Sequence, residues 1–129
     1  MQNVQKIIFV FGNEDVPIDS LPLRIVPALR LAFPECRFEI KDPNEEWDVP
    51  EELIIIDNVV GLEAPRTFDD LRHFSAGPMV SLHDFDAYAN LRLLQKLGKL
   101  KRLKIIGLPP GMAEDTATEA AEKALRAVT

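Results

Sequence analysis

The chain has 129 residues, enough for one continuous hydrophobic core, and we expect residues 1–129 to form a single domain. Hydrophobic residues make up 47% of the sequence and charged residues 28%, which is ordinary globular usage and excludes a mainly disordered chain. The formal net charge is −6. This charge argues against nucleic acid or an anionic membrane surface as a partner, because both require clustered Lys and Arg.

The sequence also bears on cellular location. Its one cysteine, Cys36, cannot form an internal disulfide. The first residues lack the basic region, apolar run and small-residue cleavage site of a signal peptide. No segment reaches the roughly 18 apolar residues that a membrane helix requires. We therefore expect a cytoplasmic protein without membrane insertion, whose oligomeric state the sequence does not indicate.

Compact apolar runs predict the strands of a sheet. Near-continuous apolarity is typical of strands that are buried on both faces, as in a parallel sheet. Four such runs are present: Gln5–Phe11, Leu53–Asp57, Pro78–His83 and Arg102–Leu108. The segment Cys36–Lys41 instead alternates, which predicts a strand with one more polar face. Within the less regular segment 58–77, residues 67–74 are compatible with a short helical turn or an edge strand.

Apolar residues at helical spacing predict a first helix over Leu21–Phe33, with Ser20 or Asp19 as its N-cap. Pro27 conflicts with a helix that begins at Leu21, because proline beyond the first turn costs about 3 kcal/mol. We therefore expect this helix either to begin near Arg24 or to be kinked.

Two further helices are predicted. The second is expected to begin at Asp86 as its cap and to run to Leu97, with Gly98 as its stop signal. Its buried face is expected to carry Tyr88, Leu91 and Leu94. The third covers residues 113–128 and is supported by the i,i+4 pairs Glu119–Lys123 and Glu122–Arg126. Strands that alternate with helices predict a three-layer α/β/α fold, with a mostly parallel, twisted sheet and helices on both faces.

Polar side chains follow the predicted strands, and ligands of open α/β sheets bind at the carboxyl ends of the strands. Asp57 closes the strand 53–57, and His83 closes the strand 78–83. Four polar residues follow the first strand, namely Asn13, Glu14, Asp15 and Asp19, and two more follow His83, namely Asp84 and Asp86. Two carboxylates and an imidazole that meet at one point would suit a divalent ion such as Ni²⁺, Zn²⁺ or Fe²⁺.

Each of these residues also has a simpler interpretation. A lone Asp at a strand end is usually a turn former or a helix cap, and a lone His is more often a hydrogen-bonded surface residue. Glu14 and Asp15 are rival candidates for the ligand supplied by the first loop. His73 is expected at the surface. Trp47 is expected to pack as a lid over the core, and Glu45 and Glu46 to be solvated.

The sequence gives little support for other catalytic mechanisms. The serine-hydrolase elbow, the paired-histidine zinc motif, the P-loop and the dinucleotide-binding fingerprint are all absent. Cys36 opens a strand, and the chain has only two histidines that could activate it. Ser81 shares the predicted sheet face of His83, but serine catalysis also needs an oriented base and an oxyanion hole. For a hydrolase, a metal would be the simplest source of the nucleophile.

Four short motifs occur in order along nearly the whole chain. They are Gly12-Asn13 followed by Ile18-Asp19 and Arg24–Leu29, then Ile54–Gly61, then Ser81–His83, and finally Ile105–Pro110. In content, spacing and order they resemble the motifs of the hydrogenase maturation proteases. Such proteases remove a C-terminal extension from the large subunit of a nickel-iron hydrogenase after nickel has been inserted.

The resemblance implies a function and a set of site residues. The metal-binding positions of the family carry over to Asp19, Asp57 and His83, which would make these the catalytic and metal-recognising residues. The expected partner is the hydrogenase large-subunit precursor, which presents its own Ni²⁺, although another divalent metal is also compatible with these ligands. The alternatives are a non-catalytic binding module or chaperone for a metalloenzyme subunit on the same scaffold, and a small domain that binds an anionic molecule. The acidic strand ends disfavour the anion binder.

Overall fold

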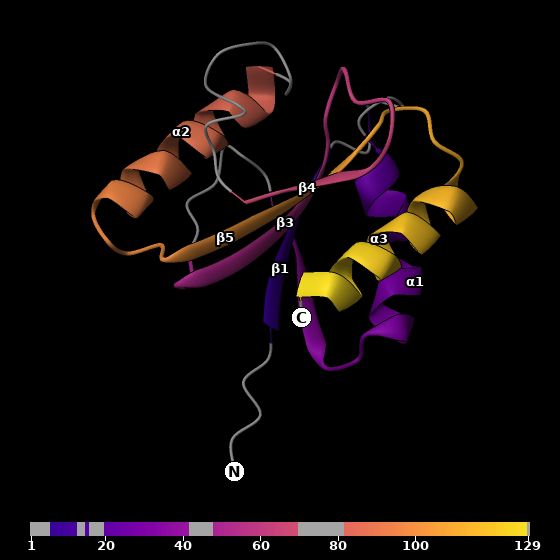
Figure 1. Ribbon diagram of the computed structural model, residues 1–129, viewed down its shortest axis with the longest axis horizontal. Coiled ribbons are helices and arrows are strands. Elements are labelled where there is room, and N and C mark those ends of the chain that lie inside the picture. Colours follow the sequence, from indigo (N-terminus) through magenta and orange to yellow (C-terminus); the bar gives the residue numbers. More distant parts are fainter. Residues whose placement is uncertain (1–5, 13–14, 16–19, 42–47, 70–81, 129) are drawn as a thin grey trace.

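The computed structural model describes residues 6–12, 15, 20–41, 48–69 and 82–128, and for residues 82–87 it describes the backbone only. The chain forms an α/β fold in which one sheet is flanked by helices on both faces (Figure 1). The strands are β1 (Lys6–Phe11), β2 (Cys36–Lys41), β3 (Glu52–Asn58), β4 (Arg66–Phe68) and β5 (Arg102–Leu108). The helices are α1 (Leu21–Ala32), α2 (Leu82–Lys96) and α3 (Glu114–Val128).

The sheet has the strand order β2-β1-β3-β5-β4. The first four strands in this order are parallel, and β4 is antiparallel to β5. The runs around Ile7, Ile55 and Ile106 are therefore neighbouring parallel strands, which confirms the expectation from their apolarity. The middle of each run is buried because helices cover both faces.

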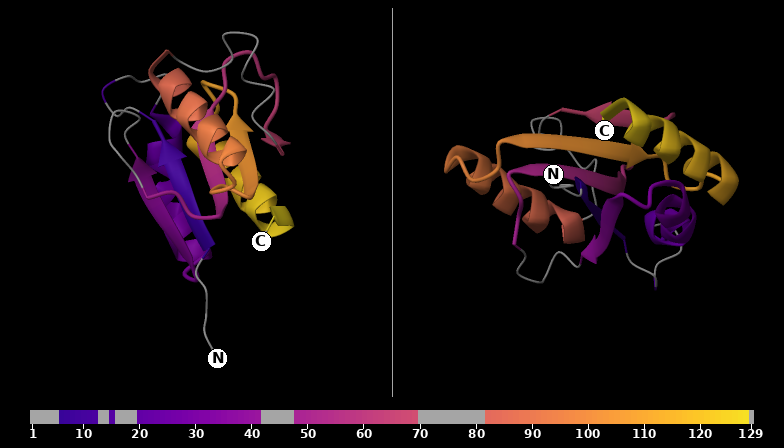
Figure 2. Two further views of the ribbon diagram at one scale, coloured as in Figure 1. Left: turned by 90° about the vertical axis from the view of Figure 1, so that its left-hand side faces the viewer. Right: turned by 90° about the horizontal axis from the view of Figure 1, so that it is seen from below.

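The helices form two layers. Helices α1 and α3 cover one face of the sheet, and α2 covers the other (Figures 1 and 2). Alternating residues of each central strand face the two layers, so that Ile54 and Ile56 join the core beneath α1 and α3, whereas Leu53 and Ile55 join the core beneath α2. The α2 side of this core includes Tyr88 and Leu91, as predicted for the apolar face of that helix.

Helix α1 begins at Leu21 and continues through Pro27. Of the two expected alternatives, a start near Arg24 was wrong, and a kink at Pro27 stays a prediction. Pro22 lies in the first turn, where the missing N–H has no helical partner to lose. Pro27 lies inside the helix, and its side chain is exposed. Ser20 is the N-cap residue by position, but its hydroxyl accepts a hydrogen bond from Arg24 Nε at 3.1 Å and makes no capping bond.

The largest correction concerns the predicted strand Pro78–His83 and the predicted start of the second helix at Asp86. Residues 78–81 lie outside the described residues, whereas Leu82 and His83 are the first residues of α2, and Asp86 lies inside that helix. The physical reason is visible in the spacing of Leu82, Phe85, Tyr88 and Leu91, which continues the helical repeat backwards by two turns. Acidic residues near a helix N-terminus also favour this earlier start.

The remaining elements agree with the predictions. Helix α2 ends at Lys96, and Gly98 adopts a φ of 76°, as a helix stop requires. The open choice within residues 67–74 is resolved in part, since Arg66–Phe68 is an antiparallel edge strand and residues 70–74 lie outside the described part of the chain. On α3, Arg126 Nη2 lies 3.7 Å from Glu122 Oε2. None of the described helices is long and apolar enough to cross a membrane.

Candidate functional site

Buried polar side chains gather at one end of the sheet. Within the described part of the chain they are Ser20, Asp57 and Asn58. Asp57 and Asn58 are the last two residues of β3, and Ser20 precedes the helix that follows β1. Polar groups lose hydration when they are buried, so a core normally places few of them together. The buried polar side chains of the described residues therefore belong to segments at the carboxyl ends of β1 and β3.

Asp57 is the most deeply buried of these residues. It lies on β3, between β1 and β5, with an exposed fraction of 0%. Its Oδ2 accepts a hydrogen bond of 3.0 Å from the hydroxyl of Tyr88 on α2. A fully buried carboxylate needs such donors, because an ionised group without them is strongly disfavoured in the core. The prediction that this run is a central strand is confirmed, but β3 ends at Asn58, one residue after Asp57.

Gly107 lies beside Asp57 in the sheet and keeps the strand end compact. The two residues are register partners on β5 and β3. A Cβ atom at Gly107 would lie 2.9 Å from Val59 Cγ2, 3.0 Å from Leu62 Cδ1 and 3.1 Å from Phe68 Cε2. The loop after β3 can therefore fold back over β5 only because residue 107 has no side chain. A backbone bond of 3.0 Å from Val59 N–H to the Leu108 carbonyl fixes this loop.

This packing predicts that Gly107→Ala lowers the free energy of unfolding by about 1–3 kcal/mol, the usual cost of an overpacked core. Urea titration of both proteins measures the change. The double variant Val59→Ala/Gly107→Ala removes the nearest colliding atom and should lose less stability than the sum of the two single variants. If the two losses of stability add, the contact with Val59 is not the cause of the destabilisation by Gly107→Ala.

The side chains of the other two predicted ligands, Asp19 and His83, lie outside the described part of the structure. Asp19 lies outside the described residues, directly before Ser20 at the start of α1. His83 lies in the first turn of α2, but its side chain is outside the described set. Tyr88, five residues after His83 on α2, contacts Asp57. The backbone of His83 therefore lies about 7.5 Å from that of Tyr88, measured along the helix axis toward its N-terminus. Whether the three side chains converge is not tested by these contacts and stays a prediction.

The structure also describes only some of the other residues that the sequence analysis considered for the site. Asp15 is described and is exposed, in contrast to the buried Asp57. Asp84 and Asp86 belong to the first two turns of α2, so neither is part of a loop after a strand. Several residues from the sequence analysis lie outside the described residues: Asn13, Glu14, Glu45, Glu46, Trp47, His73 and Ser81. Among the side chains that are described, no group of three or more His, Cys, Asp and Glu could hold a metal ion.

Cys36 is a poor candidate for a nucleophile. It opens β2, is a buried free thiol, and lies opposite Lys6 in the sheet. Burial raises the pKa of the Cys36 thiol above its ordinary value, and the nearby Glu35 acts in the same direction, while Lys6 partly opposes them. The thiol therefore stays protonated at neutral pH, which agrees with the expectation that this cysteine is not catalytic.

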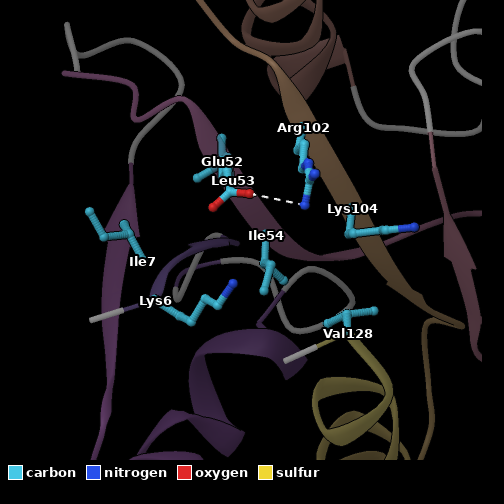
Figure 3. Close-up of a pocket in the computed structure, with 8 residues that line it drawn as sticks. All are labelled: Lys6, Ile7, Glu52, Leu53, Ile54, Arg102, Lys104 and Val128. Carbon is cyan, nitrogen blue, oxygen red and sulfur yellow. Dashed lines mark ion pairs between the residues drawn. The ribbon is translucent and has the colours of Figure 1, made fainter. Parts of the chain in front are cut away.

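A pocket opens at the other end of the sheet, where the strands begin (Figure 3). Three basic side chains and one acidic side chain line it. Arg102 pairs with Glu52 at 3.3 Å, and Lys104 pairs with Asp69, outside the pocket, at 2.6 Å. Glu52 is five residues before Asp57 on β3, a distance of about 16 Å along a strand. The pocket is thus separate from the candidate site. It is lined by Lys6, Ile7, Glu52, Leu53, Ile54, Arg102, Lys104 and Val128.

Comparison with solved structures identifies proteins with the same fold. Hydrogenase maturating endopeptidase HybD from E. coli superposes with a TM-score of 0.65 at 20% identity, over 96% of this chain and 92% of that one. A hydrogenase 3 maturation protease gives a TM-score of 0.65 at 16% identity, over 95% and 90% of the two chains. A hydrogenase 2 maturation peptidase from a Thaumarchaeota archaeon gives a TM-score of 0.57 at 16% identity, over 96% of this chain and 97% of that one.

These similarities establish a shared fold over nearly the full length of each chain. They confirm that the chain resembles the hydrogenase maturation proteases in fold. No protein-family model and no curated protein matches the sequence.

Proposed function

We propose that this protein is an endopeptidase that removes the C-terminal extension of a nickel-iron hydrogenase large-subunit precursor after nickel insertion. One observation carries the proposal: Asp57, the position that corresponds to a metal ligand in the resembling family, is a fully buried carboxylate at the end of a central strand. Strand carboxyl ends are where folds of this class bind their ligands. The fold shared with proteins that are named hydrogenase maturation endopeptidases supports the same function.

In this proposal Asp19, Asp57 and His83 recognise the nickel that the precursor carries. Imidazole and carboxylate groups are suitable ligands for Ni²⁺, and a borderline divalent ion accepts both. The nickel would polarise the scissile carbonyl or activate a water molecule. The protein's own residues fix where the precursor is held, so that only a loaded precursor brings its scissile bond to this end of the sheet. The protein itself would act in the cytoplasm.

The precursor is proposed to dock over the carboxyl ends of the strands, beside residues 58–77. The loop after β3 carries Val60, an apolar side chain that is 51% exposed and lies three residues beyond Asp57. An exposed apolar side chain next to a buried carboxylate offers a contact for the polypeptide without changing the polar site. Hydrogen exchange with and without the precursor should protect this loop. Protection restricted to the amino ends of β1, β3 and β5 would exclude this docking mode.

A second candidate function is a non-catalytic binding module or chaperone for a metalloenzyme subunit. The buried hydrogen bond between Tyr88 and Asp57 favours this candidate, because it also accounts for a carboxylate that serves the packing of the fold without taking part in a reaction. The endopeptidase would bind the hydrogenase precursor, and the binding module would bind a metalloenzyme subunit. They differ in whether a peptide bond is broken.

The metal dependence of the reaction tests the proposal. We expect the purified protein to cleave a nickel-loaded precursor and to leave the same precursor intact when it has been prepared without nickel, because the metal is part of what is recognised. Gel electrophoresis over a time course measures the fraction cleaved. Equal cleavage of both precursors would contradict metal recognition, and binding of the loaded precursor without cleavage would favour the binding module.

A further inference from the structure

We propose that Tyr88 is the positioning residue of the candidate site: its hydroxyl holds the Asp57 carboxylate in the orientation in which the nickel-bearing precursor is recognised. This inference rests on the proposed function. The hydrogen bond joins residues 31 positions apart in the chain, with 3.0 Å between Tyr88 Oη and Asp57 Oδ2. It connects the end of β3 to α2 across the interior of the protein.

The tyrosine is itself held in place by packing. Tyr88 has an exposed fraction of 3%, and its ring meets the ring of Phe11 edge to face, with a centroid distance of 5.6 Å and an interplanar angle of 66°. Phe11 is the last residue of β1. Since β1, β3 and α2 all contribute to this contact, the hydroxyl has little freedom to move, and the carboxylate that it contacts is oriented by the core.

A hydrogen bond to an ionised carboxylate is stronger than one between neutral groups. One made to Oδ2 also restricts the rotation of the carboxylate, and therefore the position of its other oxygen. Carboxylates that bind metals are generally oriented by such partners, whose loss lowers metal affinity about 10–100-fold. Tyr88 is suited to this role because a tyrosine hydroxyl orients the carboxylate without adding a competing charge.

The same bond has a second consequence. Helix α2 carries His83 in its first turn, five residues before Tyr88. A bond between Tyr88 and β3 therefore helps to hold α2 in place along the sheet, and with it the backbone of His83 relative to Asp57. One side chain would thus align two of the three proposed ligands, although it does not contact the nickel itself.

The alternative is that Tyr88 serves stability alone, since a buried phenol and a buried carboxylate each need a partner. The two roles predict different results for Tyr88→Phe, which keeps the ring and its contact with Phe11 and removes only the hydroxyl. The informative quantity is the nickel preference, defined as the affinity for the nickel-loaded precursor divided by the affinity for the nickel-free precursor. Biolayer interferometry with the full-length variants measures both affinities.

We expect Tyr88→Phe to lower the nickel preference about 10–100-fold while its affinity for the nickel-free precursor stays that of the wild type. Leu91→Val is the matched control, because it loosens the buried face of α2 one turn further along without removing the bond to Asp57. It should lower the melting temperature and keep the nickel preference. In an Asp57→Asn background, Tyr88→Phe should have no further effect on the preference.

The outcomes separate the two hypotheses. A wild-type nickel preference that persists in folded Tyr88→Phe would overturn the positioning role and leave the proposed function standing. An equal loss of affinity for both precursors would also overturn it, because it indicates a purely structural role. The absence of any nickel preference in the wild-type protein would overturn the proposed function, and this inference with it.

Discussion

Asp57→Asn should lower the rate of precursor cleavage by more than about 100-fold, since even the loss of an outer partner of a metal ligand costs about 10–100-fold. The substitution removes the negative charge at the end of β3 and leaves the shape of the side chain unchanged. The amide oxygen can still accept the hydrogen bond that Tyr88 donates to Asp57 in the wild type. The fold should therefore survive, and the loss would reflect the missing carboxylate.

The control for this variant lies on the same strand. Glu52→Gln also removes one carboxylate from β3, but at its exposed amino end, where Glu52 pairs with Arg102. It should cleave the precursor at the wild-type rate. Circular dichroism and thermal melts establish that both variants are folded, and single-turnover cleavage of the nickel-loaded precursor gives the rates. Wild-type activity in folded Asp57→Asn would exclude this carboxylate from metal recognition.

His83→Ala should have an effect of similar size, because it deletes the imidazole from the proposed set of ligands. The position belongs to the first turn of α2, and alanine is the best helix former, so the helix should be retained. The same cleavage assay measures the loss. His73→Ala, which removes the chain's other histidine, should retain activity. If His83→Ala also retains activity, the third ligand has been assigned to the wrong residue.

The strands could be predicted because their signal is local. Ile7, Ile55 and Ile106 lie within compact apolar runs, and such runs become central strands of parallel sheets when helices cover both faces. The run Pro78–His83 shows where this signal fails. A six-residue apolar run fits a strand and a helix start equally well, and Leu82 and His83 belong to the helix. The antiparallel pairing of β4 depends on a contact with β5 that no local pattern contains.

The site was predictable to a similar extent. The position of Asp57 at a strand end followed from the sequence, but its complete burial and its bond to Tyr88 did not, because they depend on how α2 packs against the sheet. Tyr88 was predicted only as an apolar contact of the helix. The signal that was available is general: a tyrosine on the buried face of a helix needs a partner for its hydroxyl. The convergence of Asp19 and His83 on Asp57 stays a prediction.

The most direct test of the central claim is the intact mass of a nickel-loaded large-subunit precursor after incubation with the wild-type protein, with Asp57→Asn as the parallel sample. Hydrolysis at one peptide bond predicts two products from the wild-type reaction, the shortened subunit and the released C-terminal peptide, whose masses sum to the precursor plus one water. The Asp57→Asn sample should contain only the precursor. An unchanged precursor mass after incubation with folded wild-type protein would contradict the account, and so would identical products in both samples.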